Sequence, residues 1–296
     1  MIPTTNKLSS PIAGCMRWGA WGADFETEDY RTMIEACLES GISSFDHADI
    51  FGDYTTEADF GRALKTLPSI RQQIQLITKC GIQFPCNNRP FYNIKSYNTS
   101  AKHIIQSVEQ SLRNFGTDYI DVLLLQRADP LMDPYEVATA IDHLKTSGKL
   151  LQFGVTNFLP HQINTLIDYT TIEYHQMEIS IIQLSPLSNG CLDNCIKHQI
   201  TPLAWAPLGG ELFNDDGHPS FRRIVSTASL LAKQYNTGIN QILIAFLHAH
   251  PSGIIPVMGT TKIDRLVQSK EAATIQLTRE DWYLLYLSSN GDELAI

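Results

Sequence analysis

The chain has 296 residues, 43% of them apolar and 18% charged, with a formal net charge of −9 at pH 7. That length fits two average domains or one α/β barrel, and the acidic balance excludes an extended nucleic-acid surface, which needs an excess of lysine and arginine. The longest apolar runs fall far short of the roughly 20 residues of a membrane span, and residues 1–15 lack a secretory signal, so we expect a cytoplasmic protein that does not enter a membrane.

Apolar strand-like runs alternate with helical patterns along the chain. The strands that these runs predict are a brief one within 11–18, then 44–48, 74–80, 119–126, 150–155, 175–180, 201–206 and 254–258. The predicted helices are 28–40, 56–67, 101–115, 135–147, 160–169, 192–198, 221–234, 240–250 and 262–272, with one more from about residue 278.

Eight apolar strands that alternate with helices predict a parallel sheet with helices on both faces. No linker or change of composition divides the chain, so we expect a single domain, residues 1–296, closed into a (β/α)8 TIM barrel. Extra helices follow strand 7 and end the chain. A doubly wound open sheet is the alternative. Two connections, 81–99 and 209–220, are long enough to serve as lids or pocket walls.

The six cysteines form no C-x-x-C pair and no zinc-finger spacing, so we expect no metal site. Cys191 and Cys195 could face one another across a helical turn, although buried thiols that do not interact are the favoured interpretation.

Polar residues end most of the predicted strands, and in such barrels catalysis takes place at the C-terminal strand ends. Lys79 is the most informative, because a buried ammonium needs a carboxylate nearby. Asp46, one strand away, is the candidate partner, and a purely structural ion pair is the alternative. The other polar strand ends are Gln126, Arg127, Thr156, Asn157, Gln176, Glu178, Trp205, Gly259 and Thr260.

The segment Gly259–Arg265 predicts an anion site. Its threonines stand at a helix N-terminus, where free backbone N–H groups bind phosphate. Lys262 and Arg265 add charge-assisted bonds, although cations alone are unfavourable at that helix end; two solvated side chains are the alternative. Trp205 precedes Gly209 and could be either a core residue or a platform for an aromatic ring.

Over nearly its whole length the chain resembles the aldo-keto reductases, in particular bacterial members of that superfamily. The matching segments, in the family's order, are Gly14–Arg17, Phe45–Gly52, Ile77–Gly81, Asp118–Leu125, Gly148–Lys149, Phe153–Phe158, Gln176–Ser180, Trp205–Gly210 and Met258–Lys262. The resemblance implies an NADP(H)-dependent oxidoreductase that moves a hydride between nicotinamide and the carbonyl or alcohol of a small molecule.

The resemblance also implies which residues bind the cofactor. Thr156, Asn157 and Gln176 would hold the nicotinamide carboxamide, and Trp205 would stack on the ring. The residues near the 2′-phosphate would be Gly259, Thr260, Thr261, Lys262 and Arg265, and those near the pyrophosphate Leu208 and Gly209. The matching segments also place Cys15, Met16, Arg17 and Ala206 at the cofactor.

The catalytic positions match only in part. In the family a tyrosine protonates the alkoxide, a lysine paired with an aspartate tunes that tyrosine, and a histidine orients the carbonyl. Asp46 and Lys79 match, but Phe51 stands at the tyrosine position and Gln126 at the histidine position. A phenyl ring has no proton to give and an amide cannot titrate. Tyr54, three residues past Phe51, could supply the missing hydroxyl.

A positioned general acid contributes about 10²–10⁴-fold to a rate, so we expect weakened or altered carbonyl reduction, with Lys79 or an ordered water supplying the proton. Acceptors that need little acid assistance, such as quinones or activated dicarbonyls, would suit such a site. The alternative is a noncatalytic protein that binds or senses NADP(H), because two of the four catalytic groups are replaced. The sequence gives no indication of the oligomeric state.

Overall fold

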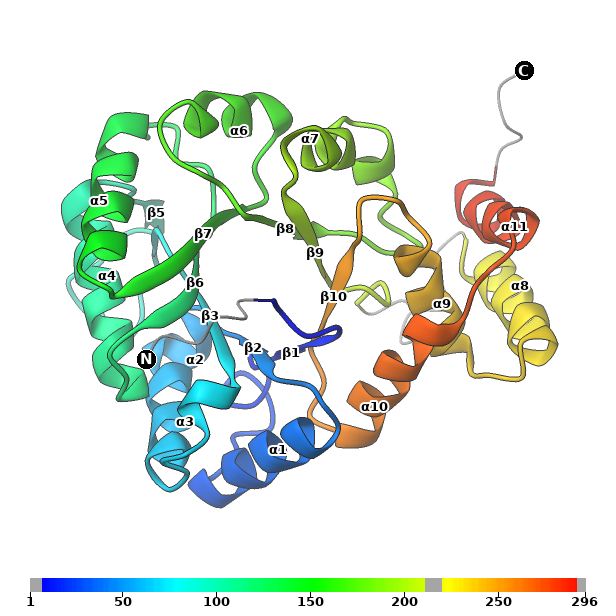
Figure 1. Ribbon diagram of the computed structural model, residues 1–296, viewed down its shortest axis with the longest axis horizontal. Coiled ribbons are helices and arrows are strands. Elements are labelled where there is room, and N and C mark those ends of the chain that lie inside the picture. Colours follow the sequence, from blue (N-terminus) through cyan, green and yellow to red (C-terminus); the bar gives the residue numbers. More distant parts are fainter. Residues whose placement is uncertain (1–6, 211–219, 292–296) are drawn as a thin grey trace.

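Eight parallel strands close into a barrel in the order β1-β10-β9-β8-β7-β6-β3-β2 in the computed structural model, which describes residues 7–210 and 220–291 (Figure 1). The barrel strands are β1 (Ile12–Gly14), β2 (Ser44–Asp46), β3 (Gln75–Cys80), β6 (Ile120–Leu125), β7 (Leu150–Thr156), β8 (Tyr174–Glu178), β9 (Thr201–Trp205) and β10 (Ile255–Met258). The predicted barrel is confirmed, and the open-sheet alternative is wrong because the last strand pairs with the first.

Helices surround the barrel, and two of them follow β9 in succession, as predicted (Figure 1). They are α1 (Thr27–Glu39), α2 (Phe51–Tyr54), α3 (Thr56–Lys65), α4 (Ala101–Phe115), α5 (Pro134–Thr146), α6 (Pro160–Ile167), α7 (Cys191–His198), α8 (Phe221–Gln234), α9 (Ile239–His248), α10 (Ile263–Glu271) and α11 (Arg279–Asn290). The additional helices α8 and α11 pack together at one side of the molecule, where the Tyr235 hydroxyl donates to Asp281 at 2.6 Å.

Local signals explain where several helices begin and end. The Ser100 side chain accepts a hydrogen bond from the backbone of His103 and starts α4, which ends at Gly116 with a left-handed φ of 67°. The Thr278 hydroxyl caps α11 in the same way through the backbone N–H of Asp281. Pro134 opens α5 at a position where a missing N–H has no cost.

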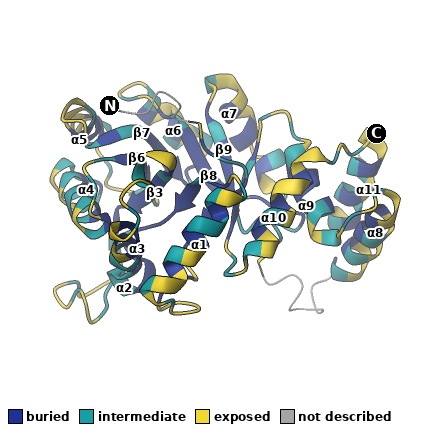
Figure 2. Cartoon of the chain, turned by 60° about the horizontal axis from the view of Figure 1, so that its bottom comes forward, coloured by how far each residue is buried: buried dark blue, intermediate teal, exposed yellow. Residues whose placement is uncertain are grey.

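Strand side chains alternate between two cores. One set, which includes Ile77, Leu124 and Leu203, fills the barrel interior, and a larger set packs between the strands and the helices. Buried residues accordingly line the strands and the inner helix faces, while the outer helix faces are exposed (Figure 2). Because the period is two, Lys79 and Trp205 share the inward face of their strands with Ile77 and Leu203, at the C-terminal end.

One connection contains strands that were not predicted from the sequence. The 81–99 connection contains a small antiparallel hairpin, β4 (Ile82–Gln83) and β5 (Ser96–Tyr97). Strands of two residues are too short to show a hydrophobic pattern in the sequence, so this hairpin was not predicted. The first strand, Ile12–Gly14, is brief and lies within 11–18, as predicted. The other predicted wall, 209–220, lies mostly outside the described residues.

All six cysteines are free, and Cys191 and Cys195 are buried. Within the described ranges, no group of three or more His, Cys, Asp or Glu side chains could hold a metal ion. Among these same residues no helix is both long and apolar enough to span a bilayer.

Candidate active site

A buried ion pair lies at the C-terminal end of the barrel. Lys79 Nζ is 2.6 Å from Asp46 Oδ1, and the two residues are 3% and 5% exposed. The ammonium also donates to the backbone oxygen of His47 at 2.7 Å. β2 and β3 are adjacent strands whose paired residues Asp46 and Ile77 bring the two side chains to the same level. The carboxylate that the sequence analysis expected beside Lys79 is therefore present.

A third buried side chain reaches this pair from another part of the barrel. Gln176 on β8 is 2% exposed, and its Nε2 donates to the same oxygen, Asp46 Oδ1, at 3.0 Å. The family resemblance implied a contact between Gln176 and the nicotinamide carboxamide. Its bond to Asp46 was not predicted.

Three polar side chains lie in a row on neighbouring strands. The pairing of Leu125 with Val155 places Gln126 beside Thr156, and Thr156 pairs directly with Gln176. Gln126 Oε1 and Thr156 Oγ1 are buried and have no hydrogen-bond partner among the residues that the structure describes. Buried polar atoms are rarely left unpaired, so this row is suited to receive a ligand with hydrogen-bonding groups.

Trp205 is oriented rather than simply packed. Its Nε1 donates to Asn157 Oδ1 at 3.0 Å, and the indole is only partly buried. Asn157 adopts a left-handed φ of 58° directly after β7, and Ala206 does so after β9 with a φ of 47°. The platform interpretation of Trp205 therefore fits better than the core interpretation.

The predicted anion segment stands on the same rim. It follows the C-terminal end of β10, and all barrel strands run parallel, so it shares that end with Asn157. Trp18 Nε1 donates to the backbone oxygen of Thr260 at 2.9 Å and ties this segment to the β1 connection. Lys262 and Arg265 are exposed at the start of α10. Neither cation forms an ion pair with any described residue.

The remaining predicted cofactor residues differ in what they can offer. Met16 and Arg17 are exposed after β1, whereas Cys15 is fully buried and its thiol points to the oxygen of Ala13. Any contribution of Cys15 must therefore come from its backbone. Among the other predicted positions on this rim, Gly259 is exposed and Gly209 is buried. The partly exposed ones are Ala206, Leu208 and Thr261.

Phe51 belongs to an aromatic wall beside the ion pair. Its ring is 8% exposed, and its centre lies 6.0 Å from that of Trp21, which in turn is 6.0 Å from Phe84. Trp21 comes from the β1–α1 connection and Phe84 follows β4. Sequence reasoning missed both, because loop aromatics show no periodicity and only their place near a strand end could have marked them.

Tyr54 does not take the place of a hydroxyl at position 51. Gly52, Asp53 and Tyr54 all have left-handed φ values, of 58°, 55° and 70°, which turn the Tyr54 side chain toward the hairpin. Its hydroxyl accepts from the backbone N–H of Phe84 at 2.9 Å and donates to the oxygen of Ile82 at 3.4 Å. The expectation that Tyr54 could replace the missing hydroxyl is therefore wrong.

Burial governs the protonation of the groups behind the ion pair. Burial first, and then Lys79, lowers the pKa of His47 to about 3, and neither ring nitrogen has a hydrogen-bond partner in the described part of the chain. Burial, and then the neighbouring Glu57, raises the pKa of Asp49 well above its ordinary value. Burial also raises the pKa of Glu57, although hydrogen bonds from Thr78, Asn114 and Ser111 oppose that shift. His47 is therefore neutral near pH 7.

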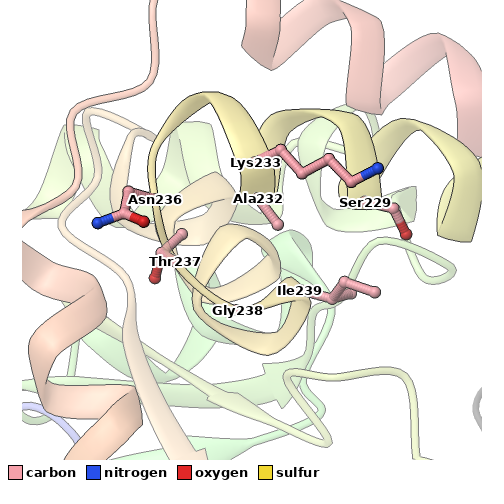
Figure 3. Close-up of a pocket in the computed structure, with 7 residues that line it drawn as sticks. All are labelled: Ser229, Ala232, Lys233, Asn236, Thr237, Gly238 and Ile239. Atoms are coloured by element: carbon pink, nitrogen blue, oxygen red, sulfur yellow. The ribbon is translucent and has the colours of Figure 1, made fainter.

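Two cavities lie away from this cluster. One of about 510 Å³ lies against α8 and α9 (Figure 3), where Lys233 and Asn236 point in opposite directions, so no polar groups converge there. The other, of about 380 Å³, includes Leu8, Thr201 and Ile255 and so lies at the N-terminal end of the strands. Neither contains a predicted site residue, and the ends of the strands remain the candidate site.

Comparison with known proteins gives consistent matches. The model of the Aldo/keto reductase family matches residues 12–285. The chain is 38% identical over 291 residues to the uncharacterized oxidoreductase YcsN of Bacillus subtilis, covering 97% of this chain and 96% of that protein. It is 40% identical over 295 residues to the oxidoreductase YdhF of Escherichia coli, covering 98% and 97%.

Two further matches concern a named activity and a solved structure. The 6-dehydroglucose reductase of Agrobacterium fabrum is 36% identical over 292 residues, covering 98% of this chain and 97% of that protein. The crystal structure of the thermostable aldo-keto reductase Tm1743 shares the fold, with a TM-score of 0.79 at 21% identity, covering 97% of this chain and 98% of that one.

Proposed function

Because this chain belongs to the aldo/keto reductase family, we propose that it transfers a hydride from NADPH to a small-molecule carbonyl and that Lys79 stabilises the reduced oxygen. The carrying observation is the buried pair of Lys79 and Asp46, 2.6 Å apart, at the same rim as the polar row and Trp205. An ion pair that served only stability would not need to lie at the C-terminal end of the strands, beside these other polar groups.

The residues at the rim suit a nicotinamide dinucleotide. Thr156 Oγ1 is a buried hydroxyl that has no partner within residues 7–210 and 220–291, and the indole of Trp205 is held in place by Asn157. A Cβ added to Gly259 would meet no atom within 4 Å, so the backbone there is open to close approach. When bound, NADPH supplies the hydride. Lys262 and Arg265, which have no described ion-pair partner, would bind the 2′-phosphate.

Lys79 is the donor best placed to act on substrate. An ammonium has three N–H groups, and two of them donate to Asp46 and to the backbone of His47. One N–H group is therefore left among the described residues, on a nitrogen that lies 5.4 Å from the Phe51 ring centre. It can donate to the oxygen of a carbonyl as negative charge develops there.

The nature of this donor favours certain substrates. Phe51 cannot donate a proton, and Gln126 can donate a hydrogen bond but cannot titrate. Quinones, whose reduced form is a stabilised phenolate, and activated dicarbonyls, whose electron-poor carbonyl accepts hydride readily, need the least help from an acid. 6-Dehydroglucose belongs in the test panel as well, because two relatives, at 36% and 31% identity, are named for its reduction.

The test is NADPH oxidation at high enzyme concentration with a quinone, a 1,2-dicarbonyl and 6-dehydroglucose as acceptors. We expect slow turnover that exceeds that of a Lys79→Met control by tenfold or more, on the order of the contribution of one positioned proton donor. Turnover equal to that of the control would rule out the proposed chemistry.

The second candidate is a noncatalytic protein that binds NADP(H). It is favoured by the absence of a titrating hydroxyl or imidazole at Phe51 and Gln126. Fluorescence titration with NADPH separates the two. Tight binding together with no hydride transfer to any acceptor would support a binding protein, and no binding would contradict both candidates.

A further inference from the structure

We propose that Gln176 is a positioning residue that connects the nicotinamide side of the site to the ion pair of Asp46 and Lys79. The inference rests on the proposed function and adds to it a residue that acts on the reaction through another residue. Its basis is one shared atom: Asp46 Oδ1 accepts from Lys79 Nζ at 2.6 Å and from Gln176 Nε2 at 3.0 Å.

This hydrogen bond crosses the interior of the barrel. β8, which carries Gln176, is separated from β2 by β9, β10 and β1 on one side and by β7, β6 and β3 on the other. No backbone ladder therefore joins Gln176 to Asp46, and the side chains make the link themselves. All three side chains are nearly inaccessible to water. In such a buried environment hydrogen bonds are stronger, and the loss of one is more costly.

The oxygen of the Gln176 amide can make a separate hydrogen bond. With Nε2 donating to Asp46, the Oε1 atom of Gln176 is available as an acceptor. Thr156, its direct partner across β7 and β8, has a buried Oγ1 to which no described residue is hydrogen-bonded. A carboxamide bound beside Thr156 has N–H groups that can donate to Gln176 Oε1.

The two hydrogen bonds would then act on one another. An amide that accepts at its oxygen donates more strongly from its nitrogen, because hydrogen bonds in a chain polarise each other. A bound carboxamide thereby strengthens the hold of Gln176 on Asp46. Asp46 in turn fixes Lys79, so that the third N–H group of the ammonium is held toward the substrate carbonyl.

The first experiment compares Gln176→Met with Thr156→Val, its matched control on the paired strand. Both variants lose one hydrogen bond toward the carboxamide, and we expect both to weaken NADPH binding in a fluorescence titration by about 3- to 10-fold. Single-turnover hydride transfer at saturating NADPH separates them. Gln176→Met should be slower by roughly tenfold or more, and Thr156→Val should be slowed less, because it removes a contact of the carboxamide but leaves the bond between Gln176 and Asp46 in place.

A second variant guards against a folding defect. Gln176→Glu keeps the length of the side chain, and its buried carboxyl, next to the Asp46 carboxylate, is expected to be protonated, so that it can still donate a hydrogen bond to Asp46. Hydride transfer should therefore be faster than in Gln176→Met and closer to that of the parent, which a merely structural role of Gln176 would not predict. If hydride transfer falls equally in Gln176→Met and Thr156→Val, Gln176 is only a cofactor contact and the proposal is wrong.

The last experiment does not need catalysis. In nucleotide-free protein, the losses of melting temperature caused by Asp46→Ala and Gln176→Met should be clearly less than additive, because both remove the same bond. Asp46→Ala and Thr156→Val should add. Additive losses for Asp46 and Gln176 would overturn the link. A coupled pair in a protein that transfers no hydride would contradict the proposed function and leave the link intact.

Discussion

The ammonium nitrogen of Lys79 lies 5.4 Å from the centre of the Phe51 ring, and both residues face the C-terminal end of the barrel. A cation over an aromatic face is attracted by the ring, so the contact is favourable without any proton being shared. The ammonium keeps its protein partners, Asp46 and the backbone of His47. The site thus retains a charged donor beside a ring that has no hydroxyl.

Restoring the two replaced groups should increase carbonyl reduction. We expect the double variant Phe51→Tyr with Gln126→His to reduce aldehydes about 100-fold faster than the parent or more, since a positioned general acid contributes about 10²–10⁴-fold. The measurement is kcat/KM with NADPH and a panel of aldehydes. A double variant no faster than the parent would show that these two positions do not limit the reaction.

Tyr54 should matter for stability and not for proton transfer. Replacing Tyr54 with Phe removes the acceptor of the Phe84 backbone N–H, and we expect the free energy of unfolding to fall by about 1–3 kcal/mol. The kcat for carbonyl reduction should change by less than about twofold, which is far below the loss of a general acid. A loss of kcat near 100-fold would instead identify Tyr54 as the acid.

Breaking the buried ion pair should destabilise the fold. Lys79→Met leaves the Asp46 carboxylate buried without its cation, and we expect the free energy of unfolding, measured in urea, to fall by about 3–5 kcal/mol. Lys149→Met is the matched control, because Lys149 pairs with Glu109 at 2.8 Å while both side chains are about a third exposed. That variant should lose about 1 kcal/mol or less. Equal losses of unfolding free energy in Lys79→Met and Lys149→Met would contradict the larger contribution inferred for the buried pair.

Arg265 should discriminate between the two nicotinamide dinucleotides. Replacing Arg265 with Ala removes a cation at the start of α10, and the affinity for NADPH should fall about 10-fold or more, as for a hydrogen bond to a charged group. Affinity for NADH should hardly change, because it has no 2′-phosphate. Lys270 at the other end of α10 is the control, and Lys270→Ala should affect neither dinucleotide. A parallel loss of both affinities in Arg265→Ala would place Arg265 away from the phosphate.

Acid should unfold the protein in part through His47. Its pKa is about 3 when folded and about 6.5 when unfolded, so between these values the unfolded state binds a proton that the folded state does not. The stabilisation is present above pH 6.5 and is lost as the pH falls, by about 1.4 kcal/mol per pH unit. In His47→Leu the free energy of unfolding should fall less steeply with decreasing pH, because one proton fewer is taken up on unfolding. His175, with its pKa lowered by burial to about 4, should keep its own contribution in that variant.

The sequence was sufficient for the barrel because eight alternating strand and helix patterns leave few topologies, and period-two alternation identifies the inward residues. It was also sufficient for Asp46 and Lys79, which lie on adjacent strands. The bond of Gln176 to Asp46 was not predictable, since it joins residues 130 apart across a barrel interior that only coordinates define. The turn of Tyr54 into the hairpin depends on three consecutive left-handed residues, which no pattern in the sequence marks.

The β4–β5 hairpin is fastened to the barrel by the Tyr54 hydroxyl, while Lys79, Asp46 and Gln176 stand on strands. In the proposed function, substrate preference and hydride chemistry therefore belong to separate parts of the chain. A hairpin of different length and composition, inserted in place of β4–β5, would give the site a new wall while the Lys79 ammonium stays unchanged. Directed evolution of this protein toward other carbonyl compounds could be confined to that one insertion.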